Sequence, residues 1–296
     1  MRELTHIVAP EEDGRRLESL LRGAMGLSRH RVSSLKFSGG IRLDGEKART
    51  DARVRAGQAV SVLLVDPPAA LAPGRLCVPV LFEDDDLLVV GKPAPLPSIR
   101  SARQGGETLE NAVYTHLGCP PRFVYRPVSR LDKGTSGLMP IALNAAMHDQ
   151  MQRLLHTDDY IREYLAVVEG APPLLEGVCG APIGRAEGVR RAVTPEGKPC
   201  RTRYKVLSQT NGRSLLLLRL ETGRTHQIRV HMAHLGCPVC GDALYGSALP
   251  ELPGRFALHS ARLRFRHPLT GEAIDLQSPL PDALAALLRA NGQADP

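Results

Sequence analysis

Asp132 lies in the stretch RLDKGTSG, residues 130–137, where two cations flank one carboxylate and a turn-like Thr-Ser-Gly follows. The apolar run GLMPIAL overlaps its end, which predicts a polar loop leading into a strand, a common position for catalytic side chains. An aspartate in such a loop is a candidate catalytic residue. The alternative is a structural aspartate that accepts backbone hydrogen bonds in an Asx turn.

Two further stretches carry residue types that suit binding. Residues 221–246, ETGRTHQIRVHMAHLGCPVCGDALYG, begin a helix expected over about 224–235. Its start holds four polar side chains within six positions: Arg224, His226, Gln227 and Arg229. In the expected strand IREYLAVVEG, Tyr164 offers a flat ring that could stack on a base, whereas a tyrosine in a buried strand is more commonly a core residue.

Other chemistries find little support in these residues. A lone aspartate lacks the second carboxylate of ordinary glycoside hydrolysis, and no GxSxG elbow or GxxxxGK[ST] loop occurs. Four potential zinc ligands follow one another at intervals of three residues, as in a Cys₂His₂ site: His231, His234, Cys237 and Cys240. Four ligands within ten residues would be unusually compact, and Gly236 and Pro238 break the helix between the pairs. We therefore expect no metal site.

The composition indicates a globular protein with a polyanionic partner. The 296 residues are 43% hydrophobic, and the net charge is +7. Arginines outnumber lysines by 32 to 6; their planar forks suit phosphates, although a GC-rich genome would give the same bias. No signal-peptide-like segment follows Met1 and no run of about 18 uncharged apolar residues occurs, which predicts a cytoplasmic address, no membrane contact and reduced cysteines.

The chain divides into three parts with α+β character. Residues 66–77 begin with DPPAALAPGR, which has the Pro-rich composition of a semi-rigid linker. Residues 1–65 are expected to form two helices and a hairpin with Asp44-Gly45 as its tight turn. Residues 78–296 alternate apolar strands with short helices, which predicts one catalytic domain with a mixed, largely antiparallel sheet.

The two N-terminal helices are strongly basic. Between residues 14 and 36 a single acid, Glu18, stands against six cations: Arg15, Arg16, Arg22, Arg29, Arg31 and Lys36. Such a face could bind phosphates or be an ordinary solvated surface. The order helix, helix, hairpin, with RLESLL, a Gly-terminated second helix and IRLDG, resembles the S-four-type RNA-binding module. That resemblance favours RNA and makes the six cations RNA-binding candidates.

The whole chain resembles the RluA-type RNA pseudouridine synthases. EDDDLLVVGKPAPLP is similar to the family's strand and KP loop, and RLDKGTSG to its catalytic motif. EYLAVVEG is similar to its tyrosine strand, TGRTHQIRVHMAHLGCPVCGDALYG to its third motif, and ALHSARLRFRHPLTG to its closing strands. Each motif is modestly specific, whereas all five in this order form a strong signature.

The resemblance implies a reaction and roles for individual residues. Uridine in structured RNA is isomerised to pseudouridine without a cofactor, after the nucleotide is flipped out of its stack. Asp132 is implied as the catalytic carboxylate, Tyr164 as the ring under the uracil, and Arg229 as the ion-pair partner of Asp132. Arg130 is implied to hold the RNA strand open, and Arg224 is a further RNA-binding candidate. Family members usually work as monomers.

The family leaves the substrate and rival functions open. Members with an S-four-type module mostly modify large-subunit ribosomal RNA, which we expect here, while some relatives act on transfer RNA. The alternatives are a catalytically silent RNA-binding or ribosome-assembly factor on the same scaffold, and a base-excising hydrolase that releases free uracil. Loss of Asp132, Tyr164 or Arg229 would have indicated a silent protein, and all three are present.

Three local features complete the expectations. Ser129 stands where the family commonly has histidine before RLD, as it does in some members. Pro140 inside GLMPIAL predicts a sheet edge or a bulge. Arg262, Arg264 and Arg266 alternate with apolar residues, so that one strand face would either extend the RNA surface or be a solvated arginine face.

Overall fold

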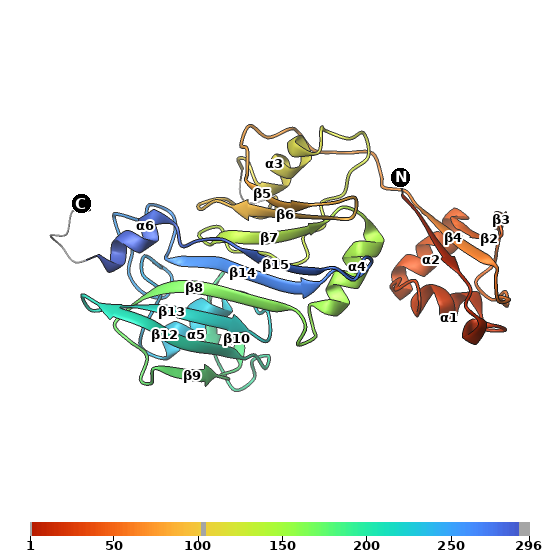
Figure 1. The fold of residues 1–296 in the computed structure, drawn as a ribbon. Coiled ribbons are helices and arrows are strands. Elements are labelled where there is room, and N and C mark those ends of the chain that lie inside the picture. The colour runs from red at the N-terminus through yellow and green to blue at the C-terminus, as the bar shows by residue number, and fades with distance from the viewer. Residues whose placement is uncertain (1, 102–104, 290–296) are drawn as a thin grey trace.

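The computed structural model describes residues 2–101 and 105–289 (Figure 1). Met1 and residues 290–296, which belong to the first and last expected parts, lie outside the described residues. The N-terminal part comprises β1 (Arg2–Ile7), the short 3-10 helix η1 (Pro10–Glu12), α1 (Leu17–Arg22), α2 (Arg29–Ser38), β2 (Ile41–Leu43), β3 (Glu46–Lys47) and β4 (Ala59–Leu64). Its antiparallel sheet has the order β1-β4-β2-β3.

The structure contains the glycine end of the second helix and the Asp44-Gly45 turn that were predicted, whereas the first strand was not predicted. Ser28 caps α2, because its Oγ accepts a hydrogen bond from the main-chain N–H of Arg31 at 3.2 Å, and Gly39 ends the helix at φ 67°. Asp44 and Gly45 have positive φ values of 49° and 85°, as the tight turn between β2 and β3 requires. Strand β1 was not predicted, because RELTHI has only two apolar residues and becomes a strand by pairing with β4.

Residues 66–77 contain no helix or strand and are bound to the catalytic part. The Asp66 carboxylate forms an ion pair with Arg126. The main-chain N–H of Gly74 donates to Thr115 Oγ1 at 2.8 Å, and that of Leu76 donates to Glu107 Oε1 at 2.7 Å. The expected linker therefore runs as a strap along α3 (Leu109–His116) rather than as a free spacer.

The remaining residues build a large mixed sheet. Its nine strands are β5 (Val80–Glu83), β6 (Leu87–Lys92), β7 (Ser136–Ala142), β8 (Ile161–Glu169), β9 (Glu176–Cys179), β12 (Thr202–Thr210), β13 (Arg213–Leu220), β14 (Leu258–Arg266) and β15 (Ala273–Gln277). The order is β5-β6-β7-β14-β8-β13-β12-β9, with β15 paired to β14. All neighbours are antiparallel except β7 and β14, which confirms the predicted mixed, largely antiparallel sheet (Figure 1).

Short elements flank this sheet. They are α3, α4 (Ala145–Leu154), the hairpin β10 (Ile183–Arg185) and β11 (Arg191–Val193), α5 (Gln227–His234), α6 (Asp282–Ala285) and the 3-10 helix η2 (Ala286–Leu288). Helix α5 begins three residues later than expected, because His226 takes a left-handed conformation at φ 59°. The Gln227 side chain accepts hydrogen bonds from Thr222 Oγ1 and the Arg224 N–H, which keeps residues 222–224 in a loop.

Pro140 lies where β7 has a strand partner on one side only, because β14 pairs with β7 at Ser136 and Gly137 alone; the predicted edge is therefore present locally, and the alternative of a bulge is not. Strand β7 pairs with β6 in unbroken register, and all seven of its residues are buried. On the other side of β7, Pro140 O accepts from the Val128 N–H at 2.9 Å. The return bond to Val128 O needs an N–H that proline lacks, and Gln152 Nε2 donates it instead, at 2.6 Å.

Helix α4 joins the N-terminal part to the catalytic part, between which it lies in Figure 1. Ala146 is fully buried in the apolar core of the N-terminal part. Asp149 Oδ2 accepts the Ser28 N–H at 3.0 Å, and Arg153 Nη2 donates to Leu27 O at 3.1 Å. Other α4 residues, among them Gln152, line a cleft in the catalytic part, so one helix contacts both.

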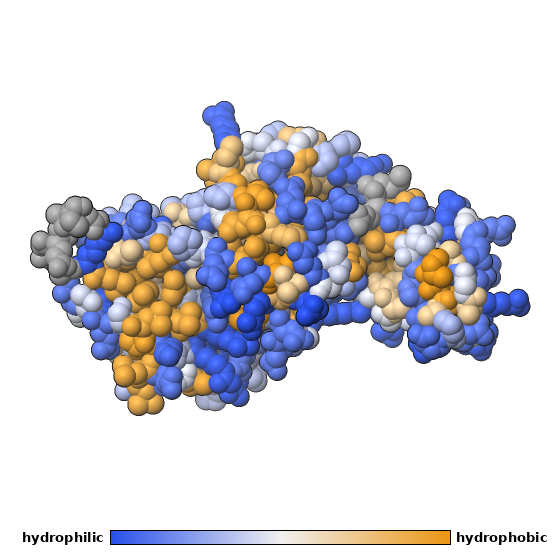
Figure 2. Space-filling model, in the orientation of Figure 1, coloured by the Kyte–Doolittle hydropathy of each residue, from blue (hydrophilic) through white to orange (hydrophobic). Residues whose placement is uncertain are grey.

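The surface of the catalytic part has an apolar end. Leu174, Leu175, Val178 and Leu207 are 44–68% exposed around β9 and β12, where Figure 2 shows a hydrophobic region. Such a patch carries no charge that could bind phosphates, so a polyanionic partner would contact another part of the surface. Within the described residues, no helix is long and apolar enough to cross a membrane.

Candidate active site

The loop before β7 presents the Asp132 carboxylate to a cleft. Its turn is closed by the main chain, because the Thr135 N–H donates to the main-chain oxygen of Asp132 at 3.0 Å. Ser98 Oγ donates to Leu131 O at 2.6 Å, and the Leu96 N–H donates to Lys133 O at 3.0 Å. The Asp132 side chain itself bonds to Arg229 rather than to the turn, which contradicts the Asx-turn alternative.

Two glycines explain the end of RLDKGTSG. A Cβ on Gly134 would lie 2.6 Å from the ring of Phe256, and one on Gly137 would lie 2.2 Å from the main-chain oxygen of Ser260. Gly137 also has φ 107°, a conformation that other residues rarely adopt. The loop therefore approaches Phe256 and β14 closely, which fixes the position of Asp132 relative to both.

Arg229 connects two carboxylates through one guanidinium. Its Nη1 donates to Asp132 Oδ2 at 2.9 Å. Its Nε and Nη2 form a bidentate pair with Asp242, at 2.6 Å and 2.8 Å. Arg229 and Asp242 are buried, whereas the Asp132 side chain is 29% exposed. Asp242 therefore fixes the guanidinium, and the remaining nitrogen is directed at the carboxylate that solvent and substrate can reach.

Aromatic rings complete the surroundings of Arg229. The guanidinium carbon lies 4.2 Å from the ring centroid of Phe256 and 5.0 Å from that of Tyr245. Burial lowers the pKa of Arg229, but the hydrogen bond and charge of Asp242, followed by Asp132, raise it above its ordinary value. The cation is therefore permanent.

His226 faces the same carboxylate from the start of α5. Its Nε2 lies 3.9 Å from Asp132 Oδ2, and its Nδ1 lies 2.8 Å from the Tyr245 hydroxyl. That hydroxyl accepts the Arg191 N–H at 2.9 Å, so its own proton is available to Nδ1 and the ring proton is assigned to Nε2. Burial lowers the pKa of His226 against the opposing charge of Asp132, which favours a neutral ring.

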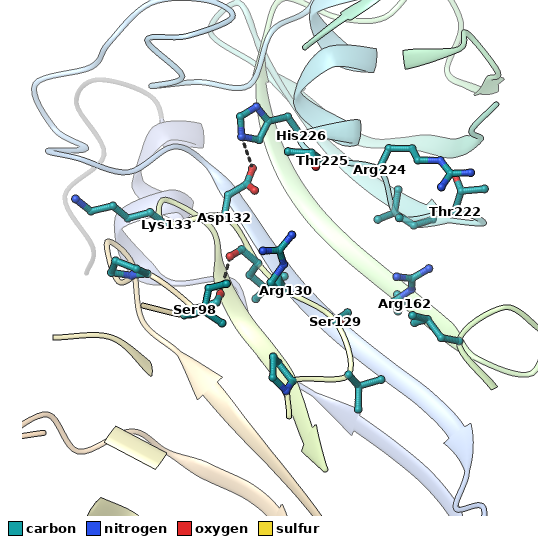
Figure 3. Close-up of a pocket in the computed structure, with 18 of the residues that line it drawn as sticks. Ser98, Ser129, Arg130, Asp132, Lys133, Arg162, Thr222, Arg224, Thr225 and His226 are labelled. Atoms are coloured by element: carbon teal, nitrogen blue, oxygen red, sulfur yellow. Dashed lines mark hydrogen bonds and ion pairs between the residues drawn. The ribbon is translucent and has the colours of Figure 1, made fainter. Parts of the chain in front are cut away.

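The cleft around Asp132 has a volume of about 900 Å³ and brings most of the predicted catalytic-domain residues together. Tyr164, Arg130 and Arg224 line it with Asp132, while Arg229 supports Asp132 from behind. Figure 3 shows Asp132 turned toward His226, with arginines from three different segments around it. Arg130 and Arg224 are exposed, and Arg224 donates to Pro199 O at 3.3 Å through both Nε and Nη2.

Tyr164 belongs to both the core and the cleft. It is 6% exposed, pairs with Ser260 and Leu218 in the sheet, and packs in the main apolar core. Burial raises the pKa of its phenol, so the ring is neutral. The two interpretations of Tyr164 are therefore compatible, because a ring held rigidly by the core forms part of the cleft wall.

The six N-terminal candidates lie on or beside α1 and α2, apart from the residues that line the cleft. Five are exposed: Arg15, Arg16, Arg22, Arg29 and Lys36. Arg31 is half-buried next to α4. Burial lowers the pKa of the cleft residue His148, and the charge of Arg31 makes a smaller contribution in the same direction. Arg31 is therefore close enough to influence the charge of His148, although none of the described residues that line the cleft belongs to α2.

The four residues of the zinc-like pattern have separate surroundings. His231 is fully buried, with Nδ1 near Thr202 Oγ1 at 2.8 Å and Nε2 near Ala181 O at 2.9 Å. Cys237 and Cys240 pack in the main core, and His234 is exposed. In the described ranges, no group of three or more His, Cys, Asp or Glu side chains is arranged to hold a metal.

Lys92, the lysine of the KP stretch, supports the catalytic loop. It is 1% exposed, and its Nζ donates to Leu96 O at 2.7 Å, Pro93 O at 3.0 Å and Lys133 O at 3.3 Å. Burial lowers the pKa of Lys92 to about 7, and the charge of Asp132 opposes that shift. The ammonium thus ties the loop after β6 to the residue that follows Asp132.

We predict that the native chain gains stability over Lys92→Met as the pH rises. The quantity compared is the difference between their free energies of unfolding. Because the pKa of Lys92 is about 7 in the folded chain and 10.5 in the reference state, the unfolded chain binds more protons between these values. The difference should grow by up to about 1.4 kcal/mol per pH unit. Urea unfolding of both proteins from about pH 7.5 to about pH 9.5 measures it, and parallel pH profiles would contradict the prediction.

Several residues of the site were not predicted from the sequence. Asp242 and Tyr245 lie in CGDALYG, which was quoted only as the end of the family's third motif; their roles depend on how the chain folds back beneath α5. Ser98 and Lys92 lie beside the prolines of GKPAPLP, which was used only as a family motif. His226 was noted for its polar neighbours, without a role.

Comparison with known proteins identifies the family. The model of the family described as RNA pseudouridylate synthase matches residues 86–234. The chain is 39% identical to ribosomal large subunit pseudouridine synthase D of Xanthomonas campestris, over 96% of this chain and 91% of that protein. It is 36% identical to the RNA pseudouridine synthase YjbO of Bacillus subtilis, over 90% of this chain and 96% of that protein.

Solved structures agree with this result. Human RNA pseudouridylate synthase domain containing 1 is 27% identical, with a TM-score of 0.58 over 76% of this chain and 100% of that chain. Human RNA pseudouridylate synthase domain containing 4 is 25% identical, with a TM-score of 0.57 over 70% of this chain and 90% of that chain. The chain belongs to the RluA-type RNA pseudouridine synthases, as its motifs predicted, and is an isomerase that acts on RNA.

Proposed function

We propose that this enzyme converts specific uridines of large-subunit ribosomal RNA to pseudouridine, with Asp132 as the catalytic carboxylate. The observation that carries the proposal is the Asp132–Arg229 ion pair of 2.9 Å at a cleft that Tyr164 also lines. Relatives named ribosomal large subunit pseudouridine synthase D, from Xanthomonas campestris and Vibrio cholerae, support ribosomal RNA as the substrate.

The geometry suggests how each residue contributes. The uridine leaves its stack and enters the cleft, where its uracil stacks on Tyr164 and its ribose faces Asp132. Arg229, held by Asp242, favours the charged carboxylate that the chemistry requires. Arg130 and Arg224 are exposed at the cleft and contact the strand from which the nucleotide was taken.

The N-terminal part is proposed to be an RNA-binding module of S-four type, residues 1–65, followed by a strap at 66–77 and the catalytic domain at 78–296. Its sheet with two helices, its own apolar core and its exposed cations support this assignment. The residues just before α2 bond to α4, and α4 also lines the cleft, so one RNA can contact both parts. We further propose that the enzyme acts as a monomer in the cytoplasm.

We predict that charge reversal on α2 weakens RNA binding whereas reversal on β14 does not. Arg29→Glu combined with Lys36→Glu should reduce the slope of log affinity against log salt by about 2, roughly one per phosphate contact. Arg264→Glu is the comparison variant on β14. The arginine face of this strand is already partly neutralised, because Arg262 forms ion pairs with Asp275 at 2.6 Å and Glu163 at 3.7 Å. A fall in the slope for Arg264→Glu would instead place the β14 face on the RNA surface.

Pseudouridine mapping of total RNA tests the proposed function. A strain lacking this protein should lose pseudouridine at one or a few ribosomal positions, and the native chain should restore it. Loss confined to transfer RNA would change the substrate, and an unchanged map would favour the silent RNA-binding alternative. Free uracil released from RNA by the purified protein would indicate the base-excising hydrolase.

A further inference from the structure

Arg162 is a buried cation in the cleft that the proposed chemistry leaves unused. It lies on β8 and is 5% exposed, yet it lines the same cleft as Asp132. Its Nε is buried without a hydrogen-bond partner, and its guanidinium carbon lies 5.7 Å from the centroid of the Tyr160 ring. Within the described residues Arg162 forms no ion pair, and the adjacent Glu163 contacts Arg262 instead.

A buried arginine with an unpaired donor is suited to bind an anion. A buried guanidinium with an unsatisfied donor is unfavourable until an acceptor arrives, and a phosphate matches its planar fork. Asp132 is the single acidic residue lining the cleft as described, and its carboxylate already bonds to Arg229. The described residues therefore supply no free carboxylate to neutralise Arg162, and a bound anion would do so.

The position of Arg162 indicates which anion it takes. Arg162 and Tyr164 are two residues apart on β8, so they point to the same face about 7 Å apart. That separation is on the scale of one nucleotide, from its base to its phosphate. Gly223 faces the guanidinium from the 222–224 loop, where a Cβ would lie 3.3 Å from Nη1, so glycine leaves room for a bound oxygen.

We propose that Arg162 binds a phosphate adjoining the nucleotide that stacks on Tyr164, and thereby positions its ribose against Asp132. The inference rests on the proposed function, because it assumes that a uridine of an RNA strand occupies the cleft. Arg162 is a substrate-binding residue in this assignment, distinct from Arg130 and Arg224, which are exposed at the cleft.

The test uses a seven-nucleotide RNA with one central uridine flanked by cytidines. Two further versions carry an uncharged methylphosphonate on the 5′ or the 3′ side of the uridine. The native enzyme should lose about tenfold or more in affinity for one of these versions and little for the other. Arg162→Met should bind the parent RNA more weakly and show no further loss with either version.

The salt dependence gives a second measurement on the same variants. Arg162→Met should reduce the salt slope by about 0.7, the value of one single-strand phosphate contact, whereas Arg162→Lys should retain most of it. Lys205→Met, which removes an equal charge from an exposed position of β12 outside the cleft, is the matched control and should leave the slope unchanged.

The outcomes separate the inference from the proposed function. A native enzyme that binds all three RNAs equally, or an Arg162→Met variant as sensitive to methylphosphonate as the native chain, overturns the role of Arg162. If the native chain then still forms pseudouridine in ribosomal RNA, only that role is lost. A native chain that forms none contradicts the proposed function itself.

Discussion

Asp132→Asn is expected to abolish pseudouridine formation while leaving the fold and RNA binding in place. Asparagine keeps the size of the side chain and can still accept the Arg229 hydrogen bond, but it carries no charge and cannot act as a nucleophile or base. Loss of a group that takes part directly in the reaction should lower the rate by at least about 10⁴-fold. Single-turnover conversion of ribosomal RNA from the deletion strain measures the effect.

The control for this variant separates charge from chemistry. Asp282→Asn removes an equal charge from an exposed residue of α6 outside the cleft and should retain full activity. Asp132→Asn should bind RNA as tightly as the native chain or more tightly, because a negative charge has been removed from a cleft that binds a polyanion. Conversion by Asp132→Asn at the native rate would make the carboxylate structural.

Sequence patterns predicted the sheet class and the central residues of the site for identifiable reasons. Leu17, Leu20 and Leu21 are spaced as on one face of a helix, and all three are buried in α1, because that periodicity depends on local geometry alone. The ion pair between Asp132 and Arg229, 97 residues apart, is a different case. No local pattern contains that contact, and it was predicted because the motifs matched a family.

The features that were missed depend on tertiary structure. Asp242 is one acid among several in the sequence, and its role appears only when the segment after α5 folds back beneath Arg229. His226 adopts a left-handed conformation that shortens the expected helix, because the Gln227 side chain bonds the preceding loop. Arg162 was not singled out in the sequence, because only its burial at the cleft distinguishes it from an ordinary strand residue.

Asp242→Asn is expected to lower both the stability of the fold and the rate of catalysis. The carboxylate is 1% exposed and accepts hydrogen bonds from two nitrogens of Arg229. In asparagine, an NH₂ group would replace one of the accepting oxygens and would face an Arg229 N–H donor. Breaking a buried pair in this way lowers the free energy of unfolding by about 3–5 kcal/mol. A displaced Arg229 would misplace Asp132 and reduce kcat by about 10²-fold, with KM little changed because Asp242 does not line the cleft.

A double variant distinguishes stability from positioning. Arg229→Met combined with Asp242→Leu replaces the buried pair with apolar groups, which should recover most of the lost stability because no buried charge is left unpaired. The Asp132 carboxylate, 29% exposed, remains solvated without its partner. Urea unfolding should therefore show a recovered fold, while single-turnover kinetics show activity no higher than that of Asp242→Asn. Recovery of activity together with stability would mean that Arg229 serves only the fold and that Asp132 reacts without it.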